Sequence, residues 1–275
     1  MSVGFFSSGS TRLTDASPPV TSFPFTVGFW VYPTTTGTTR TFWSLGNNAS
    51  TTNRYRIGQA NTNNWFMGAF ATTDSVSTVG TVTANQWAFV VVRIISATNR
   101  WLQVLEYNGV YSSVQGTQSR TPSVNQLALG GTVSSTPAEF SDAAIGDYWL
   151  CDADIGQNTA AALEVQIMRT LAYEGPLSMP HLQGKLREHW TFWGGHKNIT
   201  RQTFWTRSRS PYLWTESATP PVMTPDPPAL HQRQSRGYSL TRPRKPAPPA
   251  WMIEAAASPG WGRLLAGSRN RRVYA

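Results

Sequence analysis

The clearest pattern in the chain is an alternation of side chains over residues 25–32. Large apolar side chains occupy every second position and therefore fall on one face of an extended strand: Phe25, Val27, Phe29 and Val31. The opposite face carries Trp30 and Tyr32, so we expect that face to be covered at least in part. Proline bounds the segment at both ends, where a missing N–H disturbs a sheet least. The pattern predicts a strand in the middle of a two-layer sheet structure.

Short apolar segments of the same kind recur through the first 150 residues. We expect strands at 3–6, 40–46, 55–57, 65–70, 76–82, 87–95, 101–107, 126–129 and 143–151. Residues 87–95 are apolar on both faces, which indicates a central strand, and Asn108-Gly109 predicts a tight hairpin. Short strands at regular spacing, separated by turn residues, are typical of an antiparallel sandwich rather than of βαβ units.

The periodicity changes after residue 158. Leu163, Ile167 and Leu171 recur at helical spacing, and a glycine follows at position 175. This spacing predicts one amphipathic helix over residues 159–174 that ends in a glycine cap. Residues 186–193 alternate weakly and predict a last, returning strand.

Charge and proline content divide the chain near residue 175. Residues 1–175 carry eight Arg, no Lys and ten acidic residues, a net charge of −2, and the remaining residues carry 15 basic and four acidic residues, a net charge of +11, giving +9 in total. Eleven of the 19 prolines lie between residues 211 and 259. Residues 211–249 have too few apolar residues for a core, and in isolation we expect them to adopt an extended, polyproline-like conformation.

We therefore predict three parts. Residues 1–175 form the sandwich, residues 176–205 form the return strand and a connector, and residues 206–275 form an extended, basic, proline-rich arm.

The order of the motifs resembles that of a known family. The segments that carry the resemblance are FTVGFWVYP, TFWSLG, NQWAFVVVRI, the hairpin sequence YNG, SVNQLALGG and AAIGDYWLCDADIGQNTAAALEVQI. They are similar to the concanavalin A-like jelly roll of laminin-G type over about residues 20–175. The segment LAYEGPLSMPHLQGKLREHWTFWG resembles the ending of laminin-G-like domains in structural proteins of tailed phages. The resemblance implies an all-β antiparallel jelly-roll sandwich with one short helix, in a component of a virion.

We expect a virion structural protein without enzymatic activity, such as a capsid decoration or cement protein or another head- or tail-associated protein. Its partners would be capsid or other virion proteins, and it would act in many copies or as a homo-oligomer. Tryptophan and arginine in an extended arm are typical of interface contacts. The residues expected to bind the partner are Trp205, Arg207, Arg209, Trp214, Arg236, Arg242, Arg244, Lys245, Trp251, Trp261, Arg269, Arg271 and Arg272.

The alternative is a lectin-like domain that recognises a host-surface glycan from a phage appendage. Its ligand would bind to polar loops at the rim of the sandwich, at residues 34–39, 47–53 and 61–65. Trp65 would stack on a sugar ring, and Asn48 and Asn63 would bond to hydroxyl groups.

Catalytic and metal chemistry find little support in the sequence. Retaining hydrolysis of glycosides needs two neighbouring carboxylates, and the strands carry no close pair of glutamates, so we expect neither an enzyme nor a cofactor. Calcium requires six to eight oxygen ligands. Asp142 and Asp147 are the only candidates for such a site, and we do not expect a metal there. The single cysteine, Cys151, excludes an intramolecular disulfide.

The expected location is the virion, after synthesis in the host cytoplasm. The N-terminus lacks the basic and apolar regions of a signal peptide, and no apolar segment is long enough to span a bilayer. Nucleic acid is not the expected partner of the arm, because prolines separate its arginines and an acidic protein surface accounts for them equally well.

Overall fold

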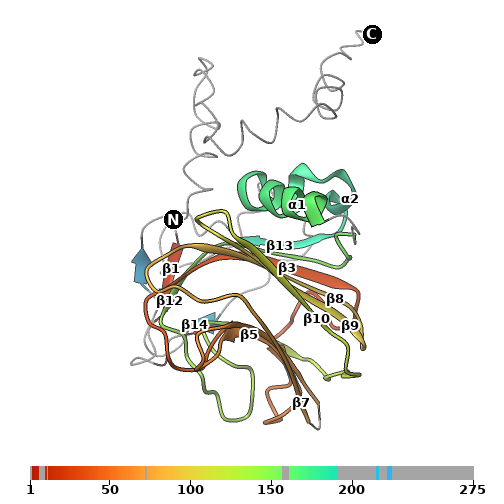
Figure 1. Ribbon diagram of the computed structural model, residues 1–275. Coiled ribbons are helices and arrows are strands. Elements are labelled where there is room, and N and C mark those ends of the chain that lie inside the picture. Colours follow the sequence, from red (N-terminus) through yellow and green to blue (C-terminus); the bar gives the residue numbers. More distant parts are fainter. Residues whose placement is uncertain are drawn as a thin grey trace, which may run out of the picture. The chain divides into compact units, whose positions relative to one another are not determined.

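Two antiparallel sheets pack face to face, and helices cover the outer face of one of them, which makes three layers (Figure 1). The computed structural model describes residues 2–5, 10, 12–71, 73–156, 161–190, 215–216 and 222–224. All of them belong to one compact unit, Met1–Gln234. The predicted all-β sandwich is confirmed.

The larger sheet has eight strands with β3 near its middle, as the alternation at Phe25 predicted. In spatial order its strands are β10 (Tyr111–Gly116), β9 (Asn99–Glu106), β8 (Ala88–Ser96), β3 (Phe25–Pro33), β12 (Ala143–Cys151), β1 (Ser2–Phe5) and β15 (Val222–Thr224), and β13 (Leu186–Trp190) also pairs with β12. β1 and β13 lie end to end along the same edge of β12, since β1 pairs with its first half and β13 with its second.

The smaller sheet has seven strands. In spatial order they are β14 (Thr215–Glu216), β2 (Leu13–Asp15), β11 (Gln126–Leu129), β4 (Arg40–Gly46), β5 (Arg54–Gln59), β6 (Trp65–Phe70) and β7 (Asp74–Val79). Because consecutive antiparallel strands turn alternately at the two ends of the sandwich, the loops divide into two groups. Rim 1 is the end formed by the loops that follow β3, β5, β7 and β9, and rim 2 is the end formed by the loops that follow β4, β6 and β8.

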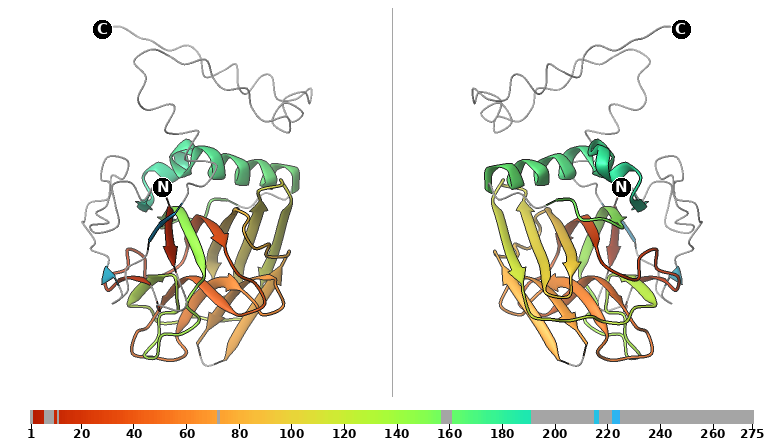
Figure 2. Two further views of the ribbon diagram at one scale, coloured as in Figure 1. Left: turned by 90° about the vertical axis from the view of Figure 1, so that its left-hand side faces the viewer. Right: turned by 90° about the vertical axis from the view of Figure 1, so that its right-hand side faces the viewer.

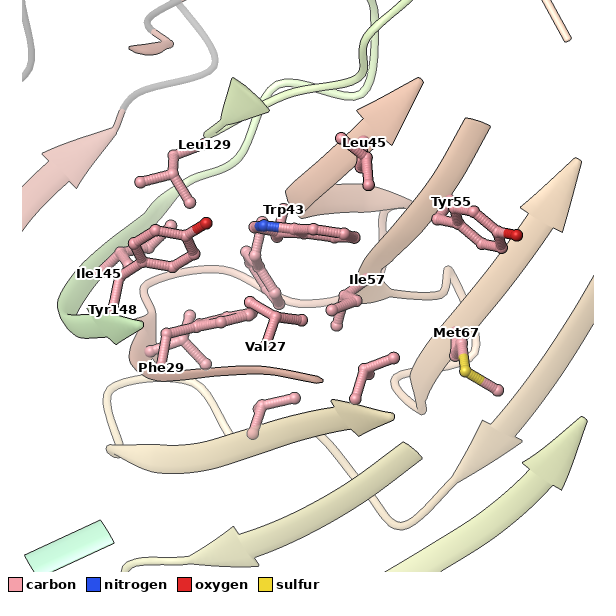
Figure 3. Close-up of a cluster of buried hydrophobic side chains, with 14 of the residues drawn as sticks. Val27, Phe29, Trp43, Leu45, Tyr55, Ile57, Met67, Leu129, Ile145 and Tyr148 are labelled. Carbon is pink, nitrogen blue, oxygen red and sulfur yellow. The ribbon is translucent and has the colours of Figure 1, made fainter. Parts of the chain in front are cut away.

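The main core fills the space between the sheets. Side chains from the inner faces of both sheets meet there, and Figure 3 labels Val27, Phe29, Trp43, Leu45, Tyr55, Ile57, Met67, Leu129, Ile145 and Tyr148. All of these side chains are buried. Burial of apolar surface on this scale makes the largest favourable contribution to the stability of such a sandwich.

A second core lies between the eight-stranded sheet and the helices α1 (Ala161–Glu174), η2 (Pro176–Ser178) and α2 (Pro180–Gln183). Both side views show α1 lying along the outer face of this sheet (Figure 2). Trp30 is 1% exposed, and its indole Nε1–H donates to the carbonyl oxygen of Ala172 at 3.0 Å. The predicted helix and its glycine cap are confirmed: Gly175 has φ 77°, and its N–H donates to the carbonyl oxygen of Leu171.

Elements that follow residue 175 pair with the eight-stranded sheet and pack in the second core. The predicted return strand is β13, and Leu182 and Leu186 are buried in the second core. Residues 211–249 were expected to be extended and polyproline-like in isolation, and within that range β14 and β15 pair with the two sheets. Two edge strands of the sandwich therefore come from the proline-rich segment.

Candidate functional site

Three aromatic side chains lie side by side on the outer face of the eight-stranded sheet at rim 1. Tyr32 lies near the end of β3, Trp87 precedes β8 and Tyr107 follows β9. The ring centroids of Tyr32 and Trp87 are 5.3 Å apart, and the N–H of Tyr107 donates to the carbonyl oxygen of Trp87 at 3.1 Å. Because neighbouring strands are about 4.8 Å apart, the three side chains form a row about 10 Å long. We call Tyr32, Trp87 and Tyr107 the aromatic row.

Helix α1 covers the aromatic row only in part, since Trp87 packs against the second core and Tyr107 neighbours Tyr173 of α1. The helix packs on the next residues inward along the same strands, Trp30, Phe89 and Leu105, and it ends at Glu174. Tyr107 is therefore 60% exposed, and Tyr32 and Trp87 are half-buried.

Aromatic rings of the second core adjoin the row on the same face of the sheet. Trp87 meets Trp30 edge to face, with the ring centroids 6.4 Å apart, and Tyr173 of α1 meets the indole of Trp30 at 5.9 Å. Burial raises the pKa of the Tyr173 hydroxyl, and the neighbouring Tyr107 raises it further. The row is therefore a surface with its rings held in place rather than a set of loose side chains.

Glu106 and Asn108 of the β9–β10 hairpin lie at the same rim, but the Glu106 side chain lies on the opposite face of β9 from Tyr107. Asn108 Nδ2 donates to Glu106 Oε2 at 3.4 Å, and its Oδ1 accepts from the N–H of Val110 at 3.0 Å. Partial burial raises the pKa of Glu106, although the bond from Asn108 opposes the shift. The aromatic faces of the row, with their hydroxyl and indole N–H groups, suit a ligand that has both an apolar face and hydroxyl groups.

Trp65 cannot stack on a sugar in this structure. It is 1% exposed and packs in the core between the sheets, with its ring centroid 5.9 Å from that of Phe42. Trp65 is the first residue of β6 rather than part of the polar loop, and its side chain points to the inner face. The prediction of a ligand-binding Trp65 is wrong.

The two predicted asparagines lie at opposite rims. Asn48 follows β4 and lies at rim 2, where its N–H donates to Asn125 Oδ1 at 3.0 Å. Asn63 follows β5 and lies at rim 1, where its Oδ1 accepts from the N–H of Gly37 at 2.5 Å. The three predicted loops therefore do not form one site: residues 34–39 and 61–65 meet at rim 1, and residues 47–53 lie at the other end of β5.

The two candidate calcium ligands are also apart. Asp142 lies at rim 1, where its carboxylate pairs with Arg40 at 3.0 Å. Asp147 lies within β12 at an irregularity with φ 48°, and its buried carboxylate is 2.8 Å from His189 Nε2. No group of three or more histidine, cysteine or acidic residues that could hold a metal ion occurs in the part of the chain that the structure describes.

Arg56 joins two acidic side chains on the outer face of the seven-stranded sheet. Its guanidinium is 2.5 Å from Glu139 and 2.6 Å from Asp74, and it lies over the ring of Phe66. Burial alone would raise the pKa of Glu139, but the charge and hydrogen bond of Arg56, together with the hydrogen bond from Thr41, lower it below its ordinary value. Glu139 is thus held as a carboxylate that fixes the loop before β12.

The predicted partner-binding residues of the arm, from Trp205 to Arg272, all lie outside the described residues. Among the described helices, none is long and apolar enough to cross a bilayer.

Comparison with models of known protein families assigns the sandwich to one of them. The family model of the concanavalin A-like lectin/glucanases superfamily matches residues 7–157, more than half of the chain. Among curated proteins, no sequence matches.

Similar solved structures include a heptameric SAP-like pentraxin from Limulus polyphemus, with 12% identity and a TM-score of 0.45 over 62% of this chain and 81% of the pentraxin. Domains LG4-5 of the mouse laminin alpha1 chain have 13% identity and a TM-score of 0.43 over 57% of this chain and 45% of theirs. The CBM40 domain of a Ruminococcus gnavus sialidase, bound to alpha2,3 sialyllactose, has 14% identity and a TM-score of 0.38 over 46% and 74% of the two chains.

Proposed function

We propose that this chain, which belongs to the concanavalin A-like lectin/glucanase superfamily, is a non-enzymatic structural protein of a phage particle. In this proposal the sandwich is displayed on the surface of the particle. The part of the arm that follows Thr224 binds to capsid or other virion proteins. The protein acts in many copies on the particle surface.

The uneven distribution of charge is the observation that carries this proposal. The first 175 residues have a net charge of −2 and the rest a net charge of +11, and six of the 12 tryptophans lie after residue 189. Arginine and tryptophan are enriched at the centres of protein interfaces. A basic segment also accelerates association with an acidic surface.

The position of β15 supports separate roles for the sandwich and for the residues that follow it. The chain up to Thr224 supplies an edge strand of the eight-stranded sheet, since β15 pairs with β1. β15 is the last described strand, and it ends at Thr224. In this proposal the remainder of the arm extends from a completed sandwich and is available for a partner.

The ion pairs of three acidic side chains favour a non-enzymatic role. A retaining glycosidase needs two carboxyl groups about 5 Å apart that are free to act on the substrate. In the described sandwich, Asp74 and Glu139 share Arg56, and Asp154 binds Arg93 through two hydrogen bonds. Carboxylates held by guanidinium groups serve structure rather than proton transfer.

Neutralising the arm tests the proposal in the full chain. We expect a variant with Arg242→Gln, Arg244→Gln and Lys245→Gln to incorporate less well into particles that lack this protein, and salt to weaken incorporation of the unchanged protein more than that of the variant. The matched control is Arg242→Lys with Arg244→Lys, which keeps the charge and is expected to incorporate like the unchanged protein. Equal incorporation of all three proteins at every salt concentration would contradict the proposal.

The aromatic row favours glycan recognition as a second candidate function. A row of three rings, one of them 60% exposed, presents an apolar surface together with two tyrosine hydroxyl groups and an indole N–H that can form hydrogen bonds. The ligand would be an oligosaccharide with exposed pyranose faces. This site replaces Trp65, Asn48 and Asn63, which the structure does not bring together.

Tyr107 provides the test of glycan recognition, because its exposed ring can be removed with little effect on the core. Tyr107→Ala is expected to weaken binding to an oligosaccharide array at least about tenfold, which corresponds to about 1.4 kcal/mol. Val76→Ala removes a side chain with 49% exposure on the other sheet and is the control that should bind normally. Absence of binding by the unchanged protein, or equal binding by Tyr107→Ala, would reject this candidate.

A further inference from the structure

The proline-rich segment adds the last strand at one edge of each sheet. β15 pairs with β1 in antiparallel register, with Val3 opposite Met223, and β14 pairs with β2, with Thr215 opposite Thr14. Without β14 and β15, β1 and β2 would be the last strands of their sheets. An edge strand with unpaired N–H and C=O groups is a template for another strand.

These contacts are main-chain pairings of very short strands. β14 has two residues and β15 has three, and five residues separate them as the chain passes from one sheet to the other. Main-chain pairing depends little on which copy of the chain supplies the strand. A strand from a second copy forms the same ladder as the chain's own strand, so the exchange leaves the contacts unchanged.

The connection that precedes these strands is long. Twenty-four residues separate the end of β13 at Trp190 from the start of β14 at Thr215. A chain of that length reaches about 80 Å when extended, more than twice the diameter of a small domain, which is about 30 Å. The entropic cost of closing a loop also changes only slowly with its length. A neighbouring copy is therefore within reach.

We propose that β14 and β15 exchange between copies of this chain and pair with β2 and β1 of a second copy. Mutual exchange between two copies gives a closed dimer with two-fold symmetry, and one-way exchange links successive copies. The effective concentration of the partner edge rises when copies are held near one another, which favours the exchange in an assembly. The inference concerns two copies of one chain and does not depend on the virion role.

Engineered disulfides distinguish the two arrangements. Opposite residues of an antiparallel pair have Cα atoms about 4.5–5.5 Å apart, which suits a disulfide. The native Cys151 is 0% exposed, and burial raises the pKa of its thiol, so it stays out of the reaction. A Val3→Cys chain and a Met223→Cys chain with different tags are unfolded together, refolded together and oxidised.

Exchange predicts a mixed disulfide between the two chains that increases with protein concentration. The control pair is Val3→Cys with Val110→Cys, which lies at an exposed position of the β9–β10 hairpin and reports random collisions. A chain carrying both Val3→Cys and Met223→Cys shows whether the pairing itself forms. The proposal is overturned if the double variant closes only within one chain and the mixed pair does not exceed the control. It is equally overturned if no disulfide forms in any sample.

Discussion

Gly28 lies where the indole of Trp149 crosses the outer face of the eight-stranded sheet. The two residues are direct partners of β3 and β12, and a Cβ atom at position 28 would overlap the indole ring. Glycine is required there because the ring occupies the space of a side chain. This contact places Trp149 beneath the helices, where it forms part of the second core.

We expect Gly28→Ala to lower the free energy of unfolding by about 1–3 kcal/mol, the usual cost of overpacking a core. Denaturant unfolding followed by tryptophan fluorescence measures the change. The matched control is Gly184→Ala, because Gly184 has φ −80° and a Cβ added there would have no neighbouring atom within 4 Å. Equal stability of the two variants would contradict the packing described for Trp149.

The ion pair of Glu139 and Arg56 predicts a dependence of stability on pH. The folded-state pKa of Glu139 is lowered, so its contribution is complete above the ordinary glutamate value of 4.5 and is lost as the pH falls through the lower folded value. Glu139→Gln should cost about 1–2 kcal/mol at pH 7, and the difference from the unchanged protein should shrink in acid.

Urea unfolding at pH 7 and at successively lower pH values measures this difference. Glu106→Gln is the control, because the pKa of Glu106 is raised and its charged form is disfavoured by the fold. The Glu106 variant should lose no stability at pH 7. A Glu139→Gln deficit that stayed constant with pH would rule out the ion pair as its cause.

The candidate site shows why single residues are hard to place from sequence. Trp65 follows four polar residues and resembles a loop residue, but it begins β6 and points inward. Tyr107 directly precedes Asn108-Gly109, and an aromatic residue beside a tight turn has little chance of reaching the core. The hairpin was predicted, and inferring the exposure of Tyr107 from it would have located the aromatic row.

At the scale of elements, periodicity predicted most of the sandwich. β4, β6, β11 and β12 have the bounds expected from the sequence, because each alternates or is apolar throughout between clear turn residues. Sequence could not tell which loops share a rim, since that depends on the order of the strands in space. For the same reason Asn48 and Asn63 were expected in one site although β5 separates them.

β14 and β15 could not be predicted from their own residues. Both are short and lie among prolines, where propensity favours an extended chain without partners. They are strands only because β2 and β1 offer free edges. Tertiary pairing therefore overrides local sequence at these positions.

Leu182 tests whether the segment after residue 175 belongs to the folded unit. It is fully buried between α2 and the eight-stranded sheet. We expect Leu182→Ala to lower the free energy of unfolding by about 2–5 kcal/mol, as large-to-small changes in a core do. Thermal unfolding measures the loss, with Val76→Ala as the exposed control at about 0.5 kcal/mol or less. A negligible effect of Leu182→Ala would restore the boundary at residue 175.

At the scale of the whole molecule, the family resemblance and the sandwich predicted from sequence are confirmed, and the virion role is our proposal. The resemblance depended on the order of several motifs, each of which is weak alone. A fold preserves this order because each motif forms a strand with a fixed place in the sheets. Function is less constrained by fold. The proposal therefore depends on the charge of the arm and on the exposed groups of the sandwich.

The structure also fixes where the arm can be removed. A chain that ends at Gly175 would lack β13, Leu182 and Leu186, and would fail to fold for reasons unrelated to its partner. A chain that ends at Thr224 retains every described strand. Only the truncation at Thr224 therefore tests binding by the arm without also removing parts of the folded sandwich.

The most direct measurement is co-sedimentation of the full chain and of the chain ending at Thr224 with particles that lack this protein, at low and high salt. Circular dichroism first establishes that the truncated chain is folded. We predict that the full chain sediments with the particles, that salt weakens its binding, and that the truncated chain stays in solution. Equal sedimentation of the two chains would contradict the proposed anchoring by the arm and place the interface on the sandwich.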